Sequence, residues 1–363
     1  MNKFIYLDAA ATMQKSESVI NAQTEFLREK YANSGRGVCA RVGLVDDMVR
    51  DVRCAVADFM NASAENIVFT SNTTDGINRI VNILKPNKNT VVAVSDLDHH
   101  SARLPFQMSG ATIVVVPLDG DLNIDVDNIP YADVFVVTAM SNVLGMPQNI
   151  PEIVRKAREK NPDVMVVVDA AQYVVHDCID VKKWDADFVV WSGHKIGADT
   201  GVGIMYIKNP TDFTPDKFGG GMVNTIAHNG DVQFVHAPEC FEAGTLPLTQ
   251  IAGLVVAIDD IKNNRPDLSL IKYLYDKLSK IERIKIISSR DARLLSFVID
   301  GMHVLDFGAI VGANDICVRV GNMCASWIHH KLGIDGSVRV SIGSYNTIDD
   351  INIFIDVVRG IVK

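Results

Sequence analysis

The sequence contains no hydrophobic run that approaches the roughly 20 residues needed to cross a membrane. Its first residues, MNKFIYLD, are too short and too soon acidic for a secretion signal. An excess of basic residues is also missing, because 44 Asp and Glu outnumber 35 Lys and Arg and give a net charge of −9. We therefore expect a cytoplasmic protein that binds no membrane and does not have nucleic acid as a partner.

Cysteine is sparse and follows no recognisable spacing. No C-x-x-C pair occurs among the six cysteines, which are Cys39, Cys54, Cys178, Cys240, Cys317 and Cys324. This scatter favours neither a zinc site nor a disulfide framework, and without an export signal we interpret the cysteines as reduced thiols. We expect no metal site.

The composition that remains is typical of a globular enzyme, with 48% hydrophobic and 22% charged residues. A chain of 363 residues is too long for one simple core. We therefore expect one large domain and one smaller domain.

The chain is organised around residues 164–207. Two apolar, β-branched runs, Val164–Val168 and Phe188–Trp191, are typical of fully buried strands. The first run ends in Asp169, the second ends in Ser192–Lys195, and a third run follows at Ile204–Ile207. Ligands of open α/β sheets lie outside the carboxyl ends of the strands, so a carboxylate and an amine are expected to meet at one site.

This pair of side chains suits pyridoxal phosphate. The cofactor needs a lysine for its Schiff base and an acid that keeps its pyridine nitrogen protonated, roles that Lys195 and Asp169 can take. Either residue alone also fits an ordinary strand-end Asp or a surface Lys. Ser192 and His194 beside the lysine favour the cofactor, because a hydroxyl and an imidazole can bind its phosphate.

Three segments here resemble a known family: V-D-A-A-Q (168–172), S-G-H-K (192–195) and G-V-G-I-M-Y (201–206). They are similar to the class V aminotransferases, which are pyridoxal phosphate-dependent enzymes of fold type I. Within that family the chain looks most like the SUF-type, or group II, cysteine desulfurases and the selenocysteine lyases. The resemblance extends over nearly the whole chain.

The resemblance implies an α/β fold of the aspartate aminotransferase type. A large domain over 13–245 should hold a mostly parallel sheet of the seven-stranded type, and residues 246–363 should form the small C-terminal α/β domain, joined by an N-terminal arm, 1–12. Apolar runs predict further buried strands at 112–117 and 134–138, and residues 224–238 look mobile. The small domain is expected to contain a strand at 294–299, a helix at 303–311 and a strand at 316–320.

A phosphate site is predicted where a strand, Ile67–Thr70, leads into a helix at about 74–84. A helix N-terminus offers unpaired N–H groups and the positive end of its dipole. Thr73 and Thr74 add hydroxyls. Taken alone, the same residues also fit a plain helix cap.

Several roles are implied by the resemblance alone. His99 would stack on the cofactor ring and carry protons as a catalytic residue, and Gln172 would donate to the ring's phenolic oxygen. Asn142, in S-N-V-L-G, would bind that oxygen or the substrate carboxylate. Thr245, in F-E-A-G-T, would reach the phosphate of a partner subunit, which implies a homodimer.

The chain departs from the family at several positions. Ala9 stands where Asn is usual and Asp98 where Glu is usual. Gly35 and Cys39 replace histidines in the loop that, in the family, lies over the neighbouring subunit's active site. Helices are expected on both sides of this loop, at 16–30 with Ser16 as its cap and at about 43–60.

The segment R-V-G-N-M-C-A (319–325) resembles the family loop with the nucleophilic cysteine, which falls on Cys324. A free thiol titrates near about 8.5 and needs a neighbouring positive charge or a proton acceptor at neutral pH. Arg319, or the cofactor site itself, can supply it. The pair Asn322 and Met323 stands where group II members commonly have two histidines.

Arg339 lies between two valines and matches the family arginine that holds the substrate's α-carboxylate. A planar guanidinium can bind a carboxylate through two parallel hydrogen bonds. The sequence thus favours a desulfurase that converts L-cysteine to L-alanine and passes sulfur to Cys324 and then to a protein acceptor. The alternatives are an aminotransferase, a lyase for selenocysteine or another amino acid, and a scaffold without activity.

Overall fold

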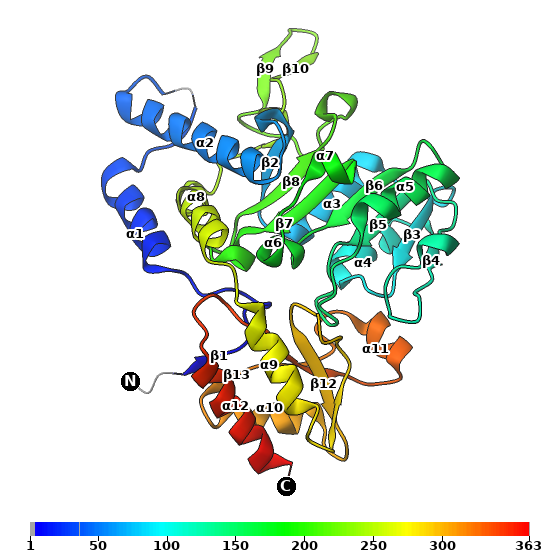
Figure 1. Ribbon diagram of the computed structural model, residues 1–363. Coiled ribbons are helices and arrows are strands. Elements are labelled where there is room, and N and C mark those ends of the chain that lie inside the picture. Colours follow the sequence, from blue (N-terminus) through cyan, green and yellow to red (C-terminus); the bar gives the residue numbers. More distant parts are fainter. Residues whose placement is uncertain (1–3, 36, 363) are drawn as a thin grey trace.

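The computed structural model describes residues 4–35 and 37–362, which form a larger and a smaller unit (Figure 1). Arg36, in the predicted loop at 33–38, lies outside the described residues. Within the described ranges, no helix is both long and apolar enough to cross a membrane.

A seven-stranded sheet forms the centre of the larger unit, as the sequence predicted. In spatial order its strands are β2 (Ile67–Thr70), β8 (Gly203–Ile207), β7 (Phe188–Ser192), β6 (Met165–Asp169), β5 (Val134–Thr138), β3 (Val91–Ser95) and β4 (Thr112–Val116). Only β8 runs antiparallel to its two neighbours; the other neighbouring strands are parallel. The carboxyl ends of β5, β6 and β7 therefore share one edge with that of β3.

Helices cover both faces of this sheet, because successive side chains of each strand point to opposite sides. Val166 and Val168 belong to one hydrophobic cluster, while Val167 belongs to another. The first cluster includes α2 (Ala40–Phe59), α5 (Ile150–Lys160), α6 (Tyr173–His176), α7 (Val181–Trp184) and α8 (Leu248–Asn263). The second includes α3 (Thr73–Leu84) and α4 (His100–Met108).

The larger hydrophobic cluster continues past residue 245, the predicted end of the large domain. Leu248, Ile251 and Leu254 of α8 are buried in it, and α8 packs against α2 and against α1 (Glu17–Glu25), which Ser16 caps as predicted. A π-helical turn (Phe26–Lys30) follows α1. Short 3₁₀ helices lie at Ala64–Asn66, Val126–Asn128, Gly193–Ile196, Pro210–Asp212 and Glu239–Phe241.

Two local predictions were wrong. The strand predicted as buried at 112–117 is β4, whose position at the sheet edge leaves Val115 46% exposed. The single strand predicted at 316–320 is divided into β13 (Ile316–Cys317) and β14 (Arg319–Gly321).

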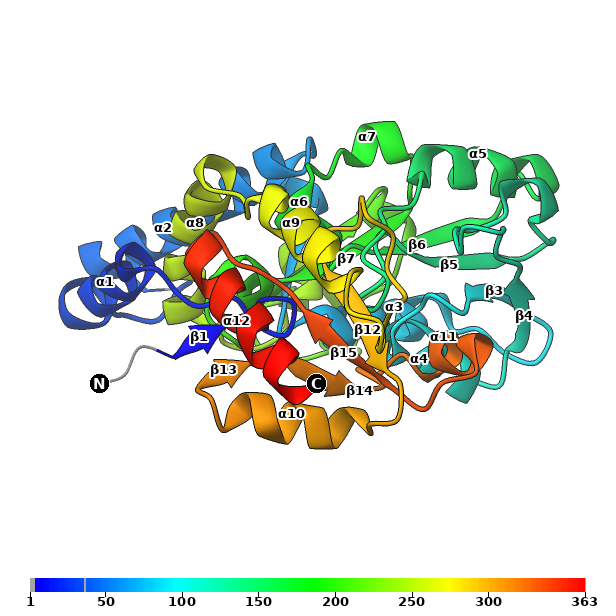
Figure 2. The same ribbon diagram turned by 60° about the horizontal axis from the view of Figure 1, so that its bottom comes forward.

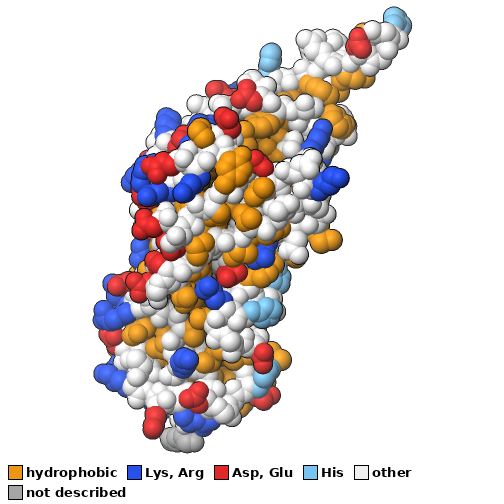
Figure 3. Space-filling view, turned by 90° about the vertical axis from the view of Figure 1, so that its right-hand side faces the viewer, with side chains coloured by type: hydrophobic (Ala, Val, Ile, Leu, Met, Phe, Trp, Pro, Cys, Tyr) orange, Lys and Arg blue, Asp and Glu red, His pale blue; other side chains and the backbone are white. Residues whose placement is uncertain are grey.

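The stretch 224–238 contains most of a hairpin of β9 (Val223–Ile226) and β10 (Val232–Phe234), which projects from the body (Figures 1 and 3).

The smaller unit is built on an antiparallel sheet of β11 (Ile284–Ile286), β12 (Leu295–Ile299), β15 (Ser337–Val340) and β14. Its hydrophobic cluster includes α9 (Leu268–Leu278), α10 (Val304–Gly312) and α12 (Ile348–Ile361), which lie near this sheet in Figure 2. A further helix, α11 (Ser326–Leu332), follows β14. The N-terminal strand β1 (Ile5–Tyr6) pairs with β13, and Leu7 is buried in the same cluster, so the first described residues belong to the smaller unit.

Candidate active site

One cavity of about 960 Å³ opens at the carboxyl ends of β5, β6 and β7. All but one of the predicted site residues line it: Thr73, Thr74, His99, Asn142, Asp169, Gln172, Ser192, His194, Lys195, Arg319, Cys324 and Arg339. These residues come from both units of the chain. The exception is Thr245, which lines a second cavity of about 780 Å³.

Lys195 lies in the 3₁₀ turn that follows β7, with its amine in the cavity. Nζ donates to the carbonyl oxygens of Ala10 (2.6 Å) and Ala11 (3.0 Å) in the N-terminal arm. Burial, together with the positive charge of the Arg339 guanidinium, lowers the pKa of Lys195 to about 8. The amine is therefore close to half-neutral under mildly alkaline conditions, as a nucleophilic lysine needs.

We expect Lys195 to react at an unusually low pH. Because only the neutral amine is nucleophilic, the labelling rate of Lys195 by trinitrobenzenesulfonate in cofactor-free protein should rise through a midpoint near pH 8. Mass spectrometry of the labelled peptide measures this rate. A Lys195→Ala variant shows which part of the labelling arises from Lys195. A midpoint near the ordinary lysine value of about 10.4 would contradict the expected desolvation of the amine.

Asp169 ends β6 and is 4% exposed. One carboxylate oxygen accepts the N–H of Ala171 at 2.9 Å. Burial raises the pKa of Asp169 to about 6, although the backbone hydrogen bond and Lys195 oppose the rise. A carboxylate so poorly solvated is suited to a cationic partner such as a protonated pyridine nitrogen.

The N-terminus of α3 meets the end of β7 on another side of the cavity. The N–H of Thr73 donates to Ser192 Oγ at 2.8 Å, and the two hydroxyl oxygens lie 2.7 Å apart. The Thr74 hydroxyl pairs in the same way with that of Ser101, also at 2.7 Å. Hydroxyls gathered at a helix N-terminus provide donors for a phosphate group.

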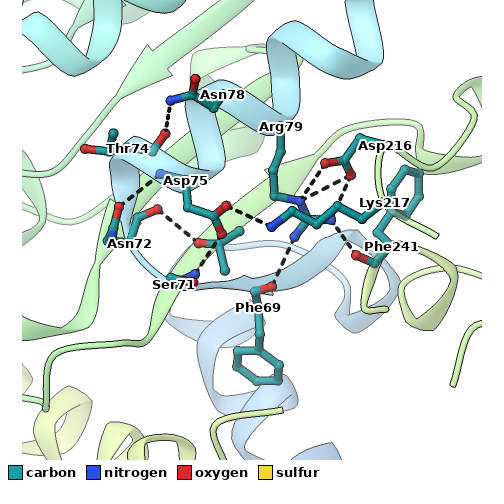
Figure 4. Close-up of polar contacts among 11 residues, drawn as sticks. Phe69, Ser71, Asn72, Thr74, Asp75, Asn78, Arg79, Asp216, Lys217 and Phe241 are labelled. Atoms are coloured by element: carbon teal, nitrogen blue, oxygen red, sulfur yellow. Dashed lines mark hydrogen bonds and ion pairs between the residues drawn. The ribbon is translucent and has the colours of Figure 1, made fainter. Parts of the chain in front are cut away.

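The same helix is fixed by ion pairs with the segment after β8 (Figure 4). Arg79 binds Asp216 through Nε and Nη2, at 2.9–3.2 Å, with both side chains less than 5% exposed. Arg79 also donates to the carbonyl oxygens of Phe69 and Phe241. Lys217 pairs with Asp75 at 2.9 Å but is 47% exposed.

These two ion pairs should differ sharply in their contribution to stability. Arg79→Met leaves the fully buried Asp216 carboxylate without its partner, which should lower the free energy of unfolding by about 3 kcal/mol. Lys217→Met breaks an exposed pair and should cost less than about 1 kcal/mol. Urea unfolding measures the free energy of unfolding of both variants. Equal losses of this free energy would contradict the expectation.

Arg339 and Arg319 share one carboxylate that the sequence reasoning missed. Arg339 Nη2 donates to Asp8 Oδ1 at 3.0 Å, and Arg319 Nη2 lies 2.6 Å from Asp8 Oδ2. Arg339 Nη1 donates to the carbonyl oxygen of Asn142 at 3.0 Å. Asp8 is 5% exposed and therefore orients both arginines at the cavity wall. Asp8 lies in the segment Y-L-D-A-A-A-T (6–12), and nothing in that segment indicates these partners.

His99 caps α4, its Nδ1 accepting the Ser101 N–H at 3.1 Å. Burial and the positive charge of Lys195 lower the pKa of His99 to about 4, so the ring is neutral near neutral pH. The preceding residue, Asp98, is fully buried and accepts the N–H groups of Ser95 (2.6 Å) and Thr138 (3.1 Å). Burial raises its pKa to about 7.

Four buried polar atoms of the cavity have no hydrogen-bond partner among the described residues: Asn142 Oδ1, Gln172 Oε1, His194 Nδ1 and Arg339 Nε. Buried polar groups are rarely unpaired, so these atoms point to a polar ligand. With the amine of Lys195 and the carboxylate of Asp169 they offer what pyridoxal phosphate and an amino acid require. The residues present therefore fit the predicted cofactor.

Comparison with known proteins gives the same picture. The family model described as "Aminotransferase class-V" matches residues 5–354. A curated cysteine desulfurase of Salmonella agona is 32% identical over 371 aligned residues, which cover 96% of this chain and 90% of that protein.

Solved structures are similar over the whole chain. The apo structure of the cysteine desulfurase from Thermococcus onnurineus has a TM-score of 0.93 and 31% identity, covering 99% of this chain and 95% of that one. The Escherichia coli cysteine desulfurase CsdA has a TM-score of 0.89 and 29% identity, covering 98% and 94%. Each of these alignments therefore includes both the larger and the smaller unit of this chain.

Proposed function

Because the chain belongs to the aminotransferase class-V family and is similar to cysteine desulfurases over nearly its whole length, we propose that it is a pyridoxal phosphate-dependent cysteine desulfurase. It converts L-cysteine to L-alanine and keeps the sulfur as a persulfide on Cys324. The observation that carries this proposal is that Lys195, Asp169, Arg339 and Cys324 line a single cavity.

The cofactor would be held by residues from several strand ends. Lys195 would bind its aldehyde carbon covalently, and Asp169 would face its pyridine nitrogen. Gln172, whose amide nitrogen donates to the Ala10 carbonyl oxygen at 2.8 Å in the structure, would contact the phenolic oxygen by turning that nitrogen toward it. The phosphate would be held by Thr73, Thr74, Ser192 and His194 at the N-terminus of α3.

When bound, pyridoxal phosphate withdraws electrons from the substrate's α-carbon, which lets that carbon lose its proton and the adjacent carbon lose sulfur. Arg339 holds the α-carboxylate, and Asp8 and the Asn142 carbonyl keep its guanidinium in place. Lys195 or His99 moves the α-proton, since the amine has a pKa of about 8 and the imidazole is neutral.

Cys324 takes up the sulfur. Its thiolate attacks the substrate sulfur, so that an S–S bond forms as the substrate's C–S bond breaks. The electron pair of the broken bond stays with carbon, which accepts a proton and becomes the methyl group of alanine. Cysteine and one Cys324 thiol thus give alanine and one Cys324 persulfide.

Incubating the cofactor-loaded protein with L-cysteine, and assaying alanine, sulfide and persulfide, tests this function directly. Alanine formed in equal amounts with transferable sulfur supports a desulfurase. Amino-group transfer to a 2-oxo acid would favour an aminotransferase instead, and turnover confined to selenocysteine would favour a lyase. A protein that shows no absorbance band for bound cofactor would favour a scaffold.

We further propose a homodimer that completes each active site. The support is that Thr245 lies outside the first cavity and lines the second, together with Asn33, Gly35, Gly221 and Leu246. Loops so placed can reach across to a second copy, as the family resemblance implies. Light scattering in solution should give twice the mass of one chain, and a monomer that turns over cysteine would contradict the proposal.

The remaining part of the proposal is that this protein is cytoplasmic and that another protein accepts the sulfur from Cys324. Its support is chemical: a persulfide must be passed on before the next turnover, and Cys324 is exposed. All six cysteines are free thiols, as a reducing compartment would keep them.

A further inference from the structure

The cysteine turn, Gly321–Ala325, joins β14 to α11 and has an unusual backbone. Met323 and Cys324 have φ angles of +50° and +55°, in the left-handed region that residues with side chains rarely adopt. Each such residue costs about 1–2 kcal/mol, so the conformation persists only where the surroundings hold it.

Two hydrogen bonds from the larger unit hold this turn. The backbone N–H of His100 donates to the carbonyl oxygen of Cys324 at 2.7 Å. Asn142 Nδ2 donates to the carbonyl oxygen of Met323 at 2.8 Å. Within the turn, Asn322 accepts the Cys324 N–H on its side chain at 3.2 Å and the Ala325 N–H on its carbonyl at 2.8 Å.

The His100 side chain extends the same contact to α11. Its Nε2 accepts the N–H of Ser326 at 3.3 Å and lies 3.1 Å from the Ser326 hydroxyl. Its ring meets Trp327 edge-on at 5.1 Å, and the Arg103 guanidinium lies 4.3 Å from the centre of that indole ring. The first turn of α4 and the first turn of α11 are therefore in direct contact.

We propose that His100 is a positioning residue that docks the cysteine turn onto α4 and so places Cys324 at the cavity. His100 directly follows His99, which lines the cavity with Lys195, so the docking ties the thiol to the unit that holds the amine. The chemical purpose of the docking rests on the proposed function. The docking itself does not, because it concerns contacts within the protein that involve neither the cofactor nor a substrate.

Substituting His100 by proline or by alanine distinguishes the contact made by its backbone N–H from the contacts made by its imidazole. His100 is the first residue of α4, where proline is well tolerated. His99, at φ −66° and ψ 152°, already has the conformation favoured before proline. His100→Pro therefore deletes the N–H and the imidazole, while His100→Ala deletes only the imidazole, and His100→Gln keeps an acceptor for Ser326.

Hydrogen–deuterium exchange of the cofactor-loaded protein measures the docking without any substrate. Amides of residues 321–327 should exchange about tenfold faster in His100→Pro and by an intermediate factor in His100→Ala, with recovery in His100→Gln. The matched control is Ile348→Pro, at the first residue of α12, which should leave 321–327 unchanged. Exchange in His100→Pro equal to that of the unaltered protein would overturn the proposal.

Turnover of cysteine gives a second readout. A lost docking contact should lower kcat about tenfold and leave KM within about twofold, because Arg339 still holds the substrate carboxylate. If His100→Pro does not fold, equal exchange in His100→Ala and the unaltered protein overturns the docking. If the unaltered protein makes no alanine from cysteine, the proposed function fails while the exchange experiment still decides the docking.

Discussion

Cys324→Ala should abolish the release of alanine and sulfur from L-cysteine, with a fall in turnover of about 10³-fold or more. The reason is that no other described cysteine lines the cavity, so the variant has no thiol to accept the substrate sulfur. Cofactor binding should be unaffected, because the predicted cofactor contacts come from other residues. Assays of alanine and of persulfide on the protein, with the cofactor's absorbance band as reference, measure the effect.

Cys54→Ala is the matched control for this experiment. Cys54 is also an exposed free thiol, but it lies on α2, away from the cavity, and its loss should leave turnover unchanged. Full production of alanine and sulfide by Cys324→Ala would remove the central step of the desulfurase mechanism. A class V enzyme that transfers amino groups, or that releases sulfide without a protein thiol, would then explain the cavity better.

The central part of the candidate site was predictable because its residues follow buried parallel strands. Such strands are apolar on both faces and stand out as short continuous runs. Because their carboxyl ends meet at one edge, the strand pattern alone predicts that Asp169 and Ser192–Lys195 lie together, and they do. The helix predicted to bind phosphate also begins at a strand end, because α3 starts just after β2.

What sequence could not provide are contacts between distant segments and the position of a strand within its sheet. Asp8 reaches Arg339 across 331 positions, and no local pattern encodes that pairing. The edge strand β4 has the same valine-rich composition as the central strands, so composition could not show that it lies at the edge. Neither Met323 nor Cys324 is a residue typical of positive φ. The sequence therefore could not predict the conformation of the cysteine turn.

Lys195→Ala should lower cysteine turnover by at least about 10³-fold, equivalent to roughly 4 kcal/mol of lost transition-state stabilisation. Lys195 is the amine that we place at the cofactor's aldehyde carbon, and it is also a candidate for moving the α-proton. Borohydride reduction should attach pyridoxal phosphate covalently to the unaltered protein and not to the variant. Mass spectrometry of the reduced proteins measures attachment independently of turnover.

Lys208→Ala provides the comparison, because Lys208 directly follows β8 and pairs with Asp185 at the surface, far from the cavity lining. It should retain both covalent attachment and turnover. Attachment of cofactor to Lys195→Ala on reduction would mean that another amine serves the site. Lys195 lies beside the carbonyl oxygens of Ala10 and Ala11 and has a pKa near 8. If another amine binds the cofactor, this lowered pKa has no role in the chemistry. The presence of the Lys195 amine and the buried carboxylate of Asp169 in one cavity would then be structural, and the proposed chemistry would fail with it.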